Sequence, residues 1–201
     1  NGEKNIGVLE AGTGLGKTLG YLFPAIKQSK EQGKCILVSC HTKNLQDQLF
    51  YKDLPILSSA LGISLNAALL KGRSNYICKT RFNWLMNERN KILSSKDIES
   101  ILPLIIWLLY TETGDLSECS GFWNSRPVKI PSLIKSEKGY CTTSICAKND
   151  GCYFGKIRRS SQNTELLIIN HALLFAEIEN EGILPEHNTV IIDEAHNLVD
   201  T

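Results

Sequence analysis

A glycine-rich segment near the start of the chain, Ala11 to Thr18 (AGTGLGKT), restricts the possible folds more than any other feature. Glycines at these positions allow a tight turn whose backbone amides can bind phosphate oxygens. A short apolar run, Ile6 to Leu9, precedes it and predicts a buried strand, and the segment from Lys17 to Lys30 predicts a helix. The expected buried face of this helix carries Leu19, Leu22, Phe23 and Ile26. A strand, a phosphate-binding loop and a helix in this order indicate a nucleotide-binding α/β domain.

The side chains of this loop fit the binding of ATP with Mg²⁺. Lys17 is expected to neutralise charge on the β- and γ-phosphates, and the Thr18 hydroxyl to ligate Mg²⁺. Ala11 stands where the strict pattern has glycine, and it is small enough to be accepted there. A glycine-rich turn with a chance Lys-Thr pair is the alternative reading of this segment. The residues expected to bind the nucleotide are Gly12, Thr13, Gly14, Gly16, Lys17 and Thr18.

A second segment near the end of the chain, Val190 to His196 (VIIDEAH), complements the loop. Its apolar residues predict a buried strand that ends at two carboxylates. Asp193 is expected to hold the Mg²⁺ through water, and Glu194 to orient and deprotonate the attacking water. Together with Lys17, these two residues form the expected catalytic set for ATP hydrolysis.

Strand and helix patterns alternate in two stretches of the chain, up to about residue 70 and again from residue 165. Such alternation predicts a parallel sheet with helices on both faces. The expected strands are Lys34–Ser39, Leu65–Leu70, Glu165–Ile169 and Thr189–Ile192, and the expected helices between them are Thr42–Phe50 and His171–Ile178.

About ninety residues between these stretches have helical periodicity and no convincing strand, and we interpret them as an insertion. Its most apolar run, Ile101 to Tyr110, is interrupted by Pro103 and is too short to cross a bilayer. We therefore expect a buried helix there, and no signal peptide or membrane span.

Four of the seven cysteines fall in the insertion region with a spacing that suits a metal centre. They are Cys78, Cys141, Cys146 and Cys152. Four thiolates can hold an iron–sulfur cluster or a tetrahedral Zn²⁺, and the lack of a close partner for Cys78 favours the cluster. Scattered reduced cysteines in a helical core are the alternative. Cys35 and Cys40 flank an expected strand and read as small core residues, while Cys119 falls in an expected polar turn.

The formal net charge of +1 conceals two basic segments: residues 119–160 carry +6 and residues 71–93 carry +5, which leaves about −10 elsewhere. Cations for phosphates with aromatic rings for bases would suit a single-stranded nucleic-acid path, which would include Arg158 and Arg159. A solvated basic surface explains the charge equally well. The aromatic residues interleaved with these charges are Trp84, Trp123, Tyr140, Tyr153 and Phe154.

Taken together, the motifs resemble the first motor domain of the DinG/XPD family of superfamily 2 DNA helicases, in particular its bacterial DinG branch. The resemblance covers nearly the whole chain in family order. The segments that carry it are EAGTGLGKT, VSCHTKNLQDQL, LLKGRSNYIC, the C-x4-C-x5-C run at 141–152, IINHALL and IIDEAHNL.

This resemblance implies a RecA-like P-loop domain interrupted by a mainly helical iron–sulfur domain. It implies that the four cysteines bind a [4Fe-4S] cluster, and that His41, Thr42 and Gln46 contact the DNA backbone. Asn170 and His171 would lie near the DNA, although Asn170 at a strand-to-helix junction is equally a natural N-cap. It also implies ATP-driven movement from 5′ to 3′ on single-stranded DNA, with unwinding of duplexes, D-loops and R-loops in repair or recombination.

We therefore expect a motor domain in residues 1–70 and 165–201 and a cluster domain in residues 71–164. The expected partners are single-stranded and 5′-tailed or branched DNA, and the expected location is the bacterial cytoplasm, in monomeric form. Because the family's second motor domain with its arginine finger is not present, the isolated chain is expected to unwind nothing. The alternatives are an ATP-dependent nuclease-helicase of the same branch and a Zn-stabilised nucleic-acid-binding module with a vestigial ATP site.

Overall fold

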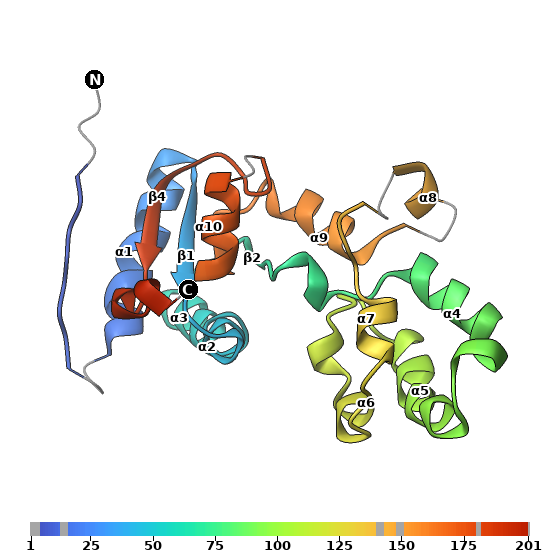
Figure 1. Cartoon of the computed structure of the whole chain (residues 1–201). Coiled ribbons are helices and arrows are strands. Elements are labelled where there is room, and N and C mark those ends of the chain that lie inside the picture. The colour runs from blue at the N-terminus through green and yellow to red at the C-terminus, as the bar shows by residue number, and fades with distance from the viewer. Residues whose placement is uncertain (1–4, 13–15, 140–142, 148–150, 180–181, 201) are drawn as a thin grey trace.

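The protein contains a parallel four-stranded sheet flanked by helices, as the alternating pattern predicted (Figure 1). The computed structural model describes residues 5–12, 16–139, 143–147, 151–179 and 182–200. All pairings in the sheet are parallel, in the order β2-β3-β1-β4. The strands are β1 (Cys35–Cys40), β2 (Ala67–Leu69), β3 (Leu166–Asn170) and β4 (His187–Ile192). The α/β fold class is therefore confirmed.

Helices cover both faces of this sheet, and its central strands are mainly apolar. All six residues of β1 are buried, including Cys35 and Cys40 as expected. One face packs against α1 (Lys17–Gln32), α2 (Lys43–Gln48) and α3 (Leu54–Leu61). The other face packs against α9 (Tyr153–Ser161) and α10 (His171–Glu179). The carboxyl edge of the sheet thus projects from a rigid three-layer core.

The first helix, α1, forms where the sequence predicts it but buries a different face. Leu22 and Ile26 are buried as expected, whereas Leu19 and Phe23 are about half exposed. Ala25 and Ser29 take their places against the sheet, and Ser29 Oγ donates to the carbonyls of Lys34 and Glu165, both at 2.8 Å. The expectation placed four large apolar side chains inward, but the buried face combines two of them with the small Ala25 and Ser29.

The expected strand at Ile6–Leu9 is wrong. These residues have no strand conformation, and the segment from residue 5 to 12 runs apart from the sheet in Figure 1. Ile6, Val8 and Leu9 are each about nine-tenths exposed. A strand needs a neighbour for its backbone hydrogen bonds, and this segment pairs with none of the four described strands.

The expected helix at Thr42–Phe50 is longer than predicted. Thr42 is its N-cap, with Oγ1 accepting from the amide of Leu45 at 3.2 Å. After α2 the chain continues through one π-helical turn, η1 (Leu49–Asp53), directly into α3. Gly62 ends α3 in the left-handed conformation.

The region between β2 and β3 is mainly helical and has a core of its own. After a 3₁₀ turn, η2 (Arg73–Asn75), come α4 (Lys79–Ile92), α5 (Ser95–Leu108), η3 (Leu116–Glu118), α6 (Ser120–Asn124), α7 (Ile130–Ile134) and α8 (Thr143–Ala147). A further 3₁₀ segment, η4 (Ala195–Asp200), follows β4. The helical core is separate from the two cores on the sheet, and its buried side chains include Ile77, Leu85, Leu104, Phe122, Ile130 and Ile134. We refer to residues 77–134 as the helical lobe.

Two expectations for this lobe need correction. The apolar run at Ile101–Tyr110 is only partly buried: Ile101 and Leu104 face the core, whereas Ile106 and Tyr110 are exposed. Cys119 is not in an open turn but is buried in the lobe's core, where its thiol points to the carbonyl of Pro103 at 3.7 Å. Within the described part of the chain, none of the helices combines the length and apolarity that a membrane crossing requires.

Candidate functional site

Several of the residues that the sequence assigned to ATP and DNA lie at the carboxyl edge of the sheet. Cys40 at the end of β1 pairs with Asn170 at the end of β3, and Ser39 pairs with Ile192 at the end of β4. The residues that follow these strand ends are His41, His171 and Asp193. Ligands of open parallel sheets bind at this edge, because loops and helix N-termini converge there.

The N-terminus of α1 lies at the same edge and has the features of an anion-binding site. Gly16 precedes the helix in the left-handed conformation (φ 74°), and no side chain of the described residues caps the first-turn amides. The first turn contains no acidic residue and begins with Lys17, which is exposed. Uncapped amides and a lysine together suit phosphate. Gly12 lies in the exposed segment before the helix, and Thr13 and Gly14 fall outside the described residues.

Asp193 is held between β1 and α1. Its backbone amide donates to the carbonyl of Ser39 at 2.8 Å, and the Tyr21 hydroxyl donates to its Oδ2 at 3.0 Å. Burial, and then the charge of Asp193, raise the pKa of Tyr21 far above its usual value, so the phenol stays a hydrogen-bond donor. Tyr21 lies one helical turn after Thr18 and donates a hydrogen bond to Asp193. It therefore connects the two residues expected to hold Mg²⁺, and the sequence analysis did not identify it. The spacing of three residues on a helix could have revealed it.

Glu194 has an unusual backbone. Its φ of 52° places it in the left-handed region, which non-glycine residues seldom occupy. Such conformations cost of order 1–3 kcal/mol and cluster at functional sites. The amide of Asn197 donates to the Glu194 carbonyl at 2.9 Å, and its side-chain nitrogen lies 3.4 Å from Oε2. The turn after β4 is thus fixed by local hydrogen bonds.

His171 is fully buried behind this edge. Its Nδ1 and the Ser39 Oγ are hydrogen-bonded at 2.7 Å, and its ring lies 6.0 Å from that of His41. Burial lowers the pKa of His171, and the neighbouring His41 lowers it further, which favours the neutral ring. Asn170 caps α10, with Oδ1 accepting from the amide of Leu173 at 3.0 Å. These contacts give both residues structural roles.

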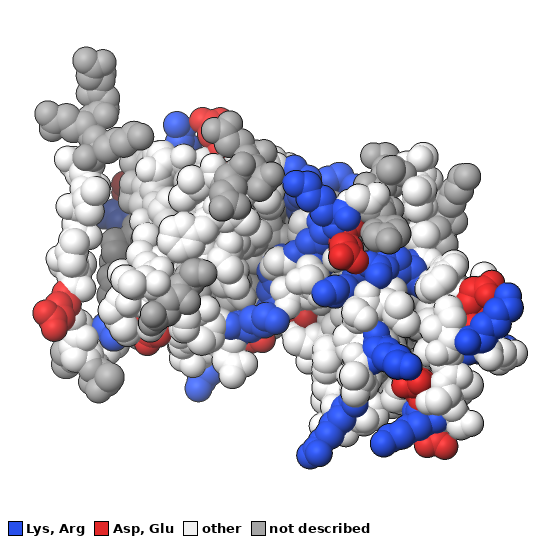
Figure 2. Space-filling model, viewed as in Figure 1, with Lys and Arg blue, Asp and Glu red and all other residues white. Residues whose placement is uncertain are grey.

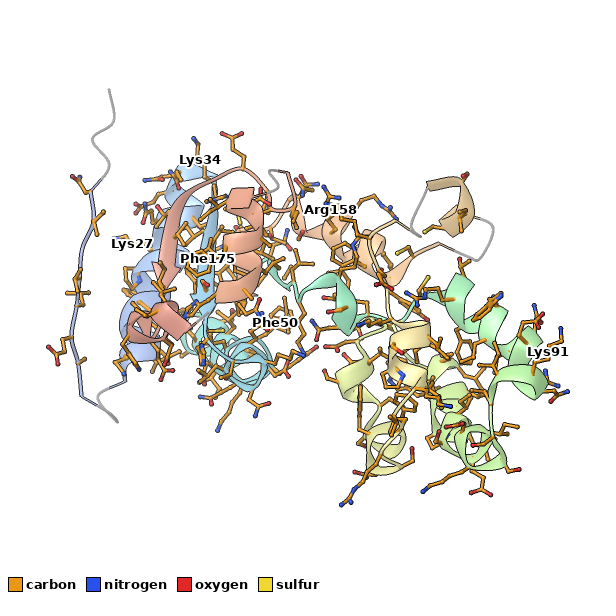
Figure 3. The ribbon with its side chains drawn as sticks, in the orientation of Figure 1. Lys27, Lys34, Phe50, Lys91, Arg158 and Phe175 are labelled. Carbon is orange, nitrogen blue, oxygen red and sulfur yellow. The ribbon has the colours of Figure 1, made fainter. Side chains whose placement is uncertain are left out.

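Among the other residues expected at the DNA, exposure differs. Thr42 is exposed and His41 half-buried, whereas Gln46 is fully buried and directs Nε2 at the carbonyl of Leu70. Arg159 is exposed, and Arg158 donates to the carbonyl of Gly182. Figure 3 shows Arg158 on α9, on the side of the sheet domain that faces the helical lobe.

Basic side chains gather on one part of the surface. In Figure 2 the Lys and Arg residues concentrate over the helical lobe and its junction with the sheet, whereas the visible surface of the sheet domain is mostly uncharged. Of the interleaved aromatic residues, Trp84 and Trp123 are about half exposed, but Phe154 is buried. Tyr140 lies outside the described residues. Phe154 therefore serves the core and not a base-stacking surface.

The expected cluster cysteines occupy the ends of neighbouring helices. Cys78 is the N-cap of α4 and Cys152 that of α9, with the Cys152 sulfur accepting from the amide of Gly155 at 3.4 Å. The residues next to them touch: Lys79 Nζ lies 5.0 Å from the centre of the Tyr153 ring. Cys146 lies on α8, which packs beside α4. Cys141 is outside the described residues, and within the described ranges three metal-binding side chains do not converge.

Comparison with protein families assigns most of the chain. Residues 2–99 match the DEAD/DEAH box helicase family, and residues 110–201 match the family described as DEAD_2. The first match includes the glycine-rich loop and β1, and the second includes α9, β3 and β4.

Individual proteins are similar to the chain over almost its full length. It is 37% identical over 199 residues to the ATP-dependent DNA helicase YoaA of Haemophilus influenzae, and 34% identical over 203 residues to YoaA of Escherichia coli. In both cases 96% of this chain aligns with 30% of the relative. It is also 33% identical over 197 residues to the 3′-5′ exonuclease DinG of Bacillus subtilis, covering 94% of the chain and 20% of that protein. The chain thus spans less than a third of these relatives.

Proposed function

We propose that this chain, which belongs to the DinG-like branch of the superfamily 2 DEAD/DEAH box helicases, is part of an ATP-dependent 5′ to 3′ DNA helicase. The observation that carries the proposal is the convergence of the α1 N-terminus with Asp193 at one edge of the sheet. The names of the YoaA relatives support the assignment to DNA helicases.

In this proposal, the start of α1 binds the phosphates of ATP. The amides of Gly16 and its neighbours donate to phosphate oxygens, and Lys17 neutralises their charge. A methyl group on the Cα of Gly16 would meet no heavy atom of the described residues beyond its chain neighbours within 4 Å, and this leaves room for the contact. Bound MgATP would supply the phosphoanhydride bond whose hydrolysis drives movement.

Thr18 and Asp193 would hold the Mg²⁺, and Glu194 would orient and deprotonate the attacking water. The hydrogen bond from Tyr21 to Asp193 supports this assignment, because it turns that carboxylate toward the helix that carries Thr18. The strained backbone of Glu194 supports a functional role for it. Lys17, Asp193 and Glu194 are thus the proposed catalytic residues.

The four cysteines Cys78, Cys141, Cys146 and Cys152 would hold a [4Fe-4S] cluster. The contact between Lys79 and Tyr153, each adjacent in sequence to one of these cysteines, supports the approach of Cys78 and Cys152. Both cysteines are N-caps, at the starts of α4 and α9. The cluster would brace α4, α8 and α9, and thereby shape the strand-separating region.

Single-stranded DNA would follow the basic surface between the sheet and the helical lobe (Figure 2). We assign direct backbone contacts to His41, Thr42 and Arg159 from their exposure, and a supporting role to the buried Gln46 and His171. Arg158 and Asn170 would approach the DNA from α9 and from the end of β3. D-loops, R-loops and 5′-tailed or branched duplexes are the proposed substrates.

This function divides the chain into a motor domain, residues 1–70 and 165–201, and a cluster domain, residues 71–164. The separate hydrophobic core of the helical lobe supports this division. Unwinding would also need a second motor lobe, because ATP-driven helicases close one lobe on another.

A second candidate is an ATP-dependent nuclease-helicase. It is favoured by the similarity to a protein named 3′-5′ exonuclease DinG, of which this chain aligns with 20%. Under this alternative, the present residues would still form the motor, and the nuclease carboxylates would lie in another part of the protein.

One experiment tests the main proposal and separates the two candidates. The full-length protein that contains this chain is given duplexes with 5′ or 3′ single-stranded tails, with and without ATP, and both unwinding and strand degradation are followed. We expect ATP-dependent unwinding of the 5′-tailed duplex that Lys17→Ala abolishes. Preference for the 3′ tail would contradict the polarity, and degradation of strands would favour the nuclease-helicase.

A further inference from the structure

The ammonium group of Lys71 is buried at the junction of the sheet with the helical lobe. Its side chain is only 3% exposed and meets two carboxylates: Asp115 Oδ2 at 2.6 Å and Asp47 Oδ1 at 2.8 Å. The Ser117 hydroxyl lies 3.3 Å away. Burial lowers the pKa of Lys71, but the hydrogen bonds and charges of the two aspartates outweigh it and raise the pKa overall. The lysine is therefore protonated, and its ammonium group contacts Asp115, Asp47 and Ser117.

The two carboxylates come from different parts of the molecule. Asp47 lies on α2, the helix that Thr42 caps directly after β1. Asp115 lies in the helical lobe and is itself fixed, because the amide and hydroxyl of Ser117 both donate to its Oδ1 at 3.0 and 2.8 Å. One cation thus links the segment after β1 to the lobe. Figure 3 shows Phe50, a short way along the chain from Asp47, on the side of the sheet domain that faces the lobe.

The main chain around Lys71 is equally constrained. Its amide donates to the Tyr76 hydroxyl at 3.0 Å, and the buried Tyr76 ring packs 5.6 Å from that of Phe154. Gln46, the neighbour of Asp47, directs its amide at the carbonyl of Leu70. Gln46 and Asp47, successive residues of α2, therefore contact the same dipeptide, Leu70-Lys71.

Stability alone does not explain a buried lysine with two carboxylates. Desolvating the Lys71 ammonium and the buried Asp115 costs free energy that their attraction, with that of the partly exposed Asp47, barely returns, and apolar residues often serve stability as well or better. A directional ionic contact instead fixes the relative orientation of the elements that it joins, and it offers two discrete states, formed or broken. This contact lies next to the proposed DNA-binding segment, so it can fix the orientation of that segment relative to the helical lobe.

We propose that Lys71 is a positioning residue that couples α2 and the DNA-binding segment at His41–Thr42 to the helical lobe, so that they move together during the ATP cycle. The inference rests on the proposed helicase function. Through this link, a displacement of α2 on ATP binding or release moves the lobe that separates the strands.

The sharpest test uses Asp47→Asn in the full-length enzyme, because this variant detaches α2 while leaving the Lys71–Asp115 pair intact. ATP turnover and base pairs unwound are measured on the same 5′-tailed duplex. We expect ATP turnover to change less than base pairs unwound per ATP, which should fall about five-fold or more, the lower end of coupling between sites. Asp115→Asn should have a similar effect, and the double variant should be no worse than either single one.

The matched control is Lys30→Met. Lys30 pairs with Glu165 at 3.0 Å within the sheet domain, and that pair does not join the lobe. This variant should lower the melting temperature without changing the ratio of base pairs to ATP. If Asp47→Asn also left that ratio unchanged in an enzyme that unwinds normally, the inference would be wrong. Absence of unwinding by the wild-type enzyme would instead contradict the proposed function.

A distance measurement that does not depend on enzymatic activity completes the test. Spin labels are attached by non-cysteine chemistry at Ser59 on α3 and Glu99 on α5, both exposed, and their distance distribution is recorded. We expect a broader distribution in Asp47→Asn and Asp115→Asn than in the wild type or Lys30→Met. Identical distributions in all four proteins would overturn the role of Lys71.

Discussion

The Tyr21 hydroxyl donates a hydrogen bond to Asp193 Oδ2 across 3.0 Å, and this contact joins the first helix of the chain to the end of its last strand. It connects two motifs that the sequence separates by most of its length. The carboxylate that would direct Mg²⁺ is therefore oriented by a phenol whose pKa is raised by burial and by that same carboxylate.

Tyr21→Phe removes this donor and retains the ring. Hydrogen bonds donated to metal-binding side chains typically account for a 10- to 100-fold change in metal affinity. We expect the Mg²⁺ concentration required for half-maximal ATP hydrolysis by the full-length enzyme to rise about ten-fold, with a smaller change in kcat at saturating Mg²⁺. Tyr110→Phe, at a largely exposed tyrosine, is the control. An unchanged Mg²⁺ requirement would show that Tyr21 does not position Asp193.

Glu194→Gln and Lys17→Ala should separate binding from hydrolysis. The glutamine cannot accept the proton of water, so nucleotide binding should persist while turnover stops. Loss of the Lys17 charge should weaken binding and abolish turnover, because several kcal/mol of transition-state stabilisation is lost. Binding of a fluorescent ATP analogue and release of phosphate measure the two effects. Normal turnover by Glu194→Gln would show that another group directs the water.

The cysteines can be tested by spectroscopy of anaerobically purified protein. Cys146→Ser and Cys152→Ser should lose visible absorbance together with iron and labile sulfide, because each thiolate supplies a bond to iron. Cys119→Ser should retain the absorbance, since this cysteine is buried in the core of the helical lobe. Stoichiometric zinc without sulfide in the wild type would identify a zinc site instead.

Gly114 and Gly62 form a matched pair for a stability test. Both have positive φ, 67° and 62°, so alanine at either should cost about 1–2 kcal/mol of backbone strain. A Cβ on Gly114 would also approach the Tyr153 ring, whose nearest atom would be 2.2 Å away, whereas the space around Gly62 is open. Urea denaturation should therefore show a clearly larger loss for Gly114→Ala. Equal losses would mean that Tyr153 moves aside without cost.

Loss of the Glu165 charge should account for part of the loss of stability of the sheet domain in acid. Burial raises its pKa, but the Asn66 amide at 2.9 Å and the Lys30 ammonium outweigh burial, so the net pKa lies below its usual value. A carboxyl with a lowered pKa contributes stability above its unfolded pKa of about 4.3 and loses it as the pH falls through the folded value. Between about pH 6 and pH 3.5, Glu165→Gln should thus lose less melting temperature than the wild type. Parallel pH profiles would contradict this.

The sheet could be predicted from the sequence because its inner strands are covered on both faces. Such strands are continuous apolar runs, and β1 and β3 lie within a residue of their expected bounds. The run at Ile6–Leu9 has the same composition, yet it lies outside the sheet. An apolar composition shows that a segment can form a buried strand. Whether a neighbouring strand is available to pair with it depends on the tertiary fold.

The candidate site was predictable only in its motifs. Lys17 and Asp193 were identified from local patterns, whereas the buried state of Gln46 and His171 depends on how β1 and β3 pair. Lys71 carries no local signal, because its partners are far away along the chain in both directions. A lone charged residue next to a strand reads as solvated until the fold brings the opposite charges to it.

The separate core of the helical lobe has a consequence for the order of folding. Ile36 on β1 pairs with Leu166 on β3, and closing so long a loop costs entropy before any strand contact forms. The lobe's contacts are mostly local, so it can condense first and shorten the effective loop. Early folding of the lobe would thus favour assembly of the sheet, and nascent chains stalled within the lobe would expose both unpaired edges of β1.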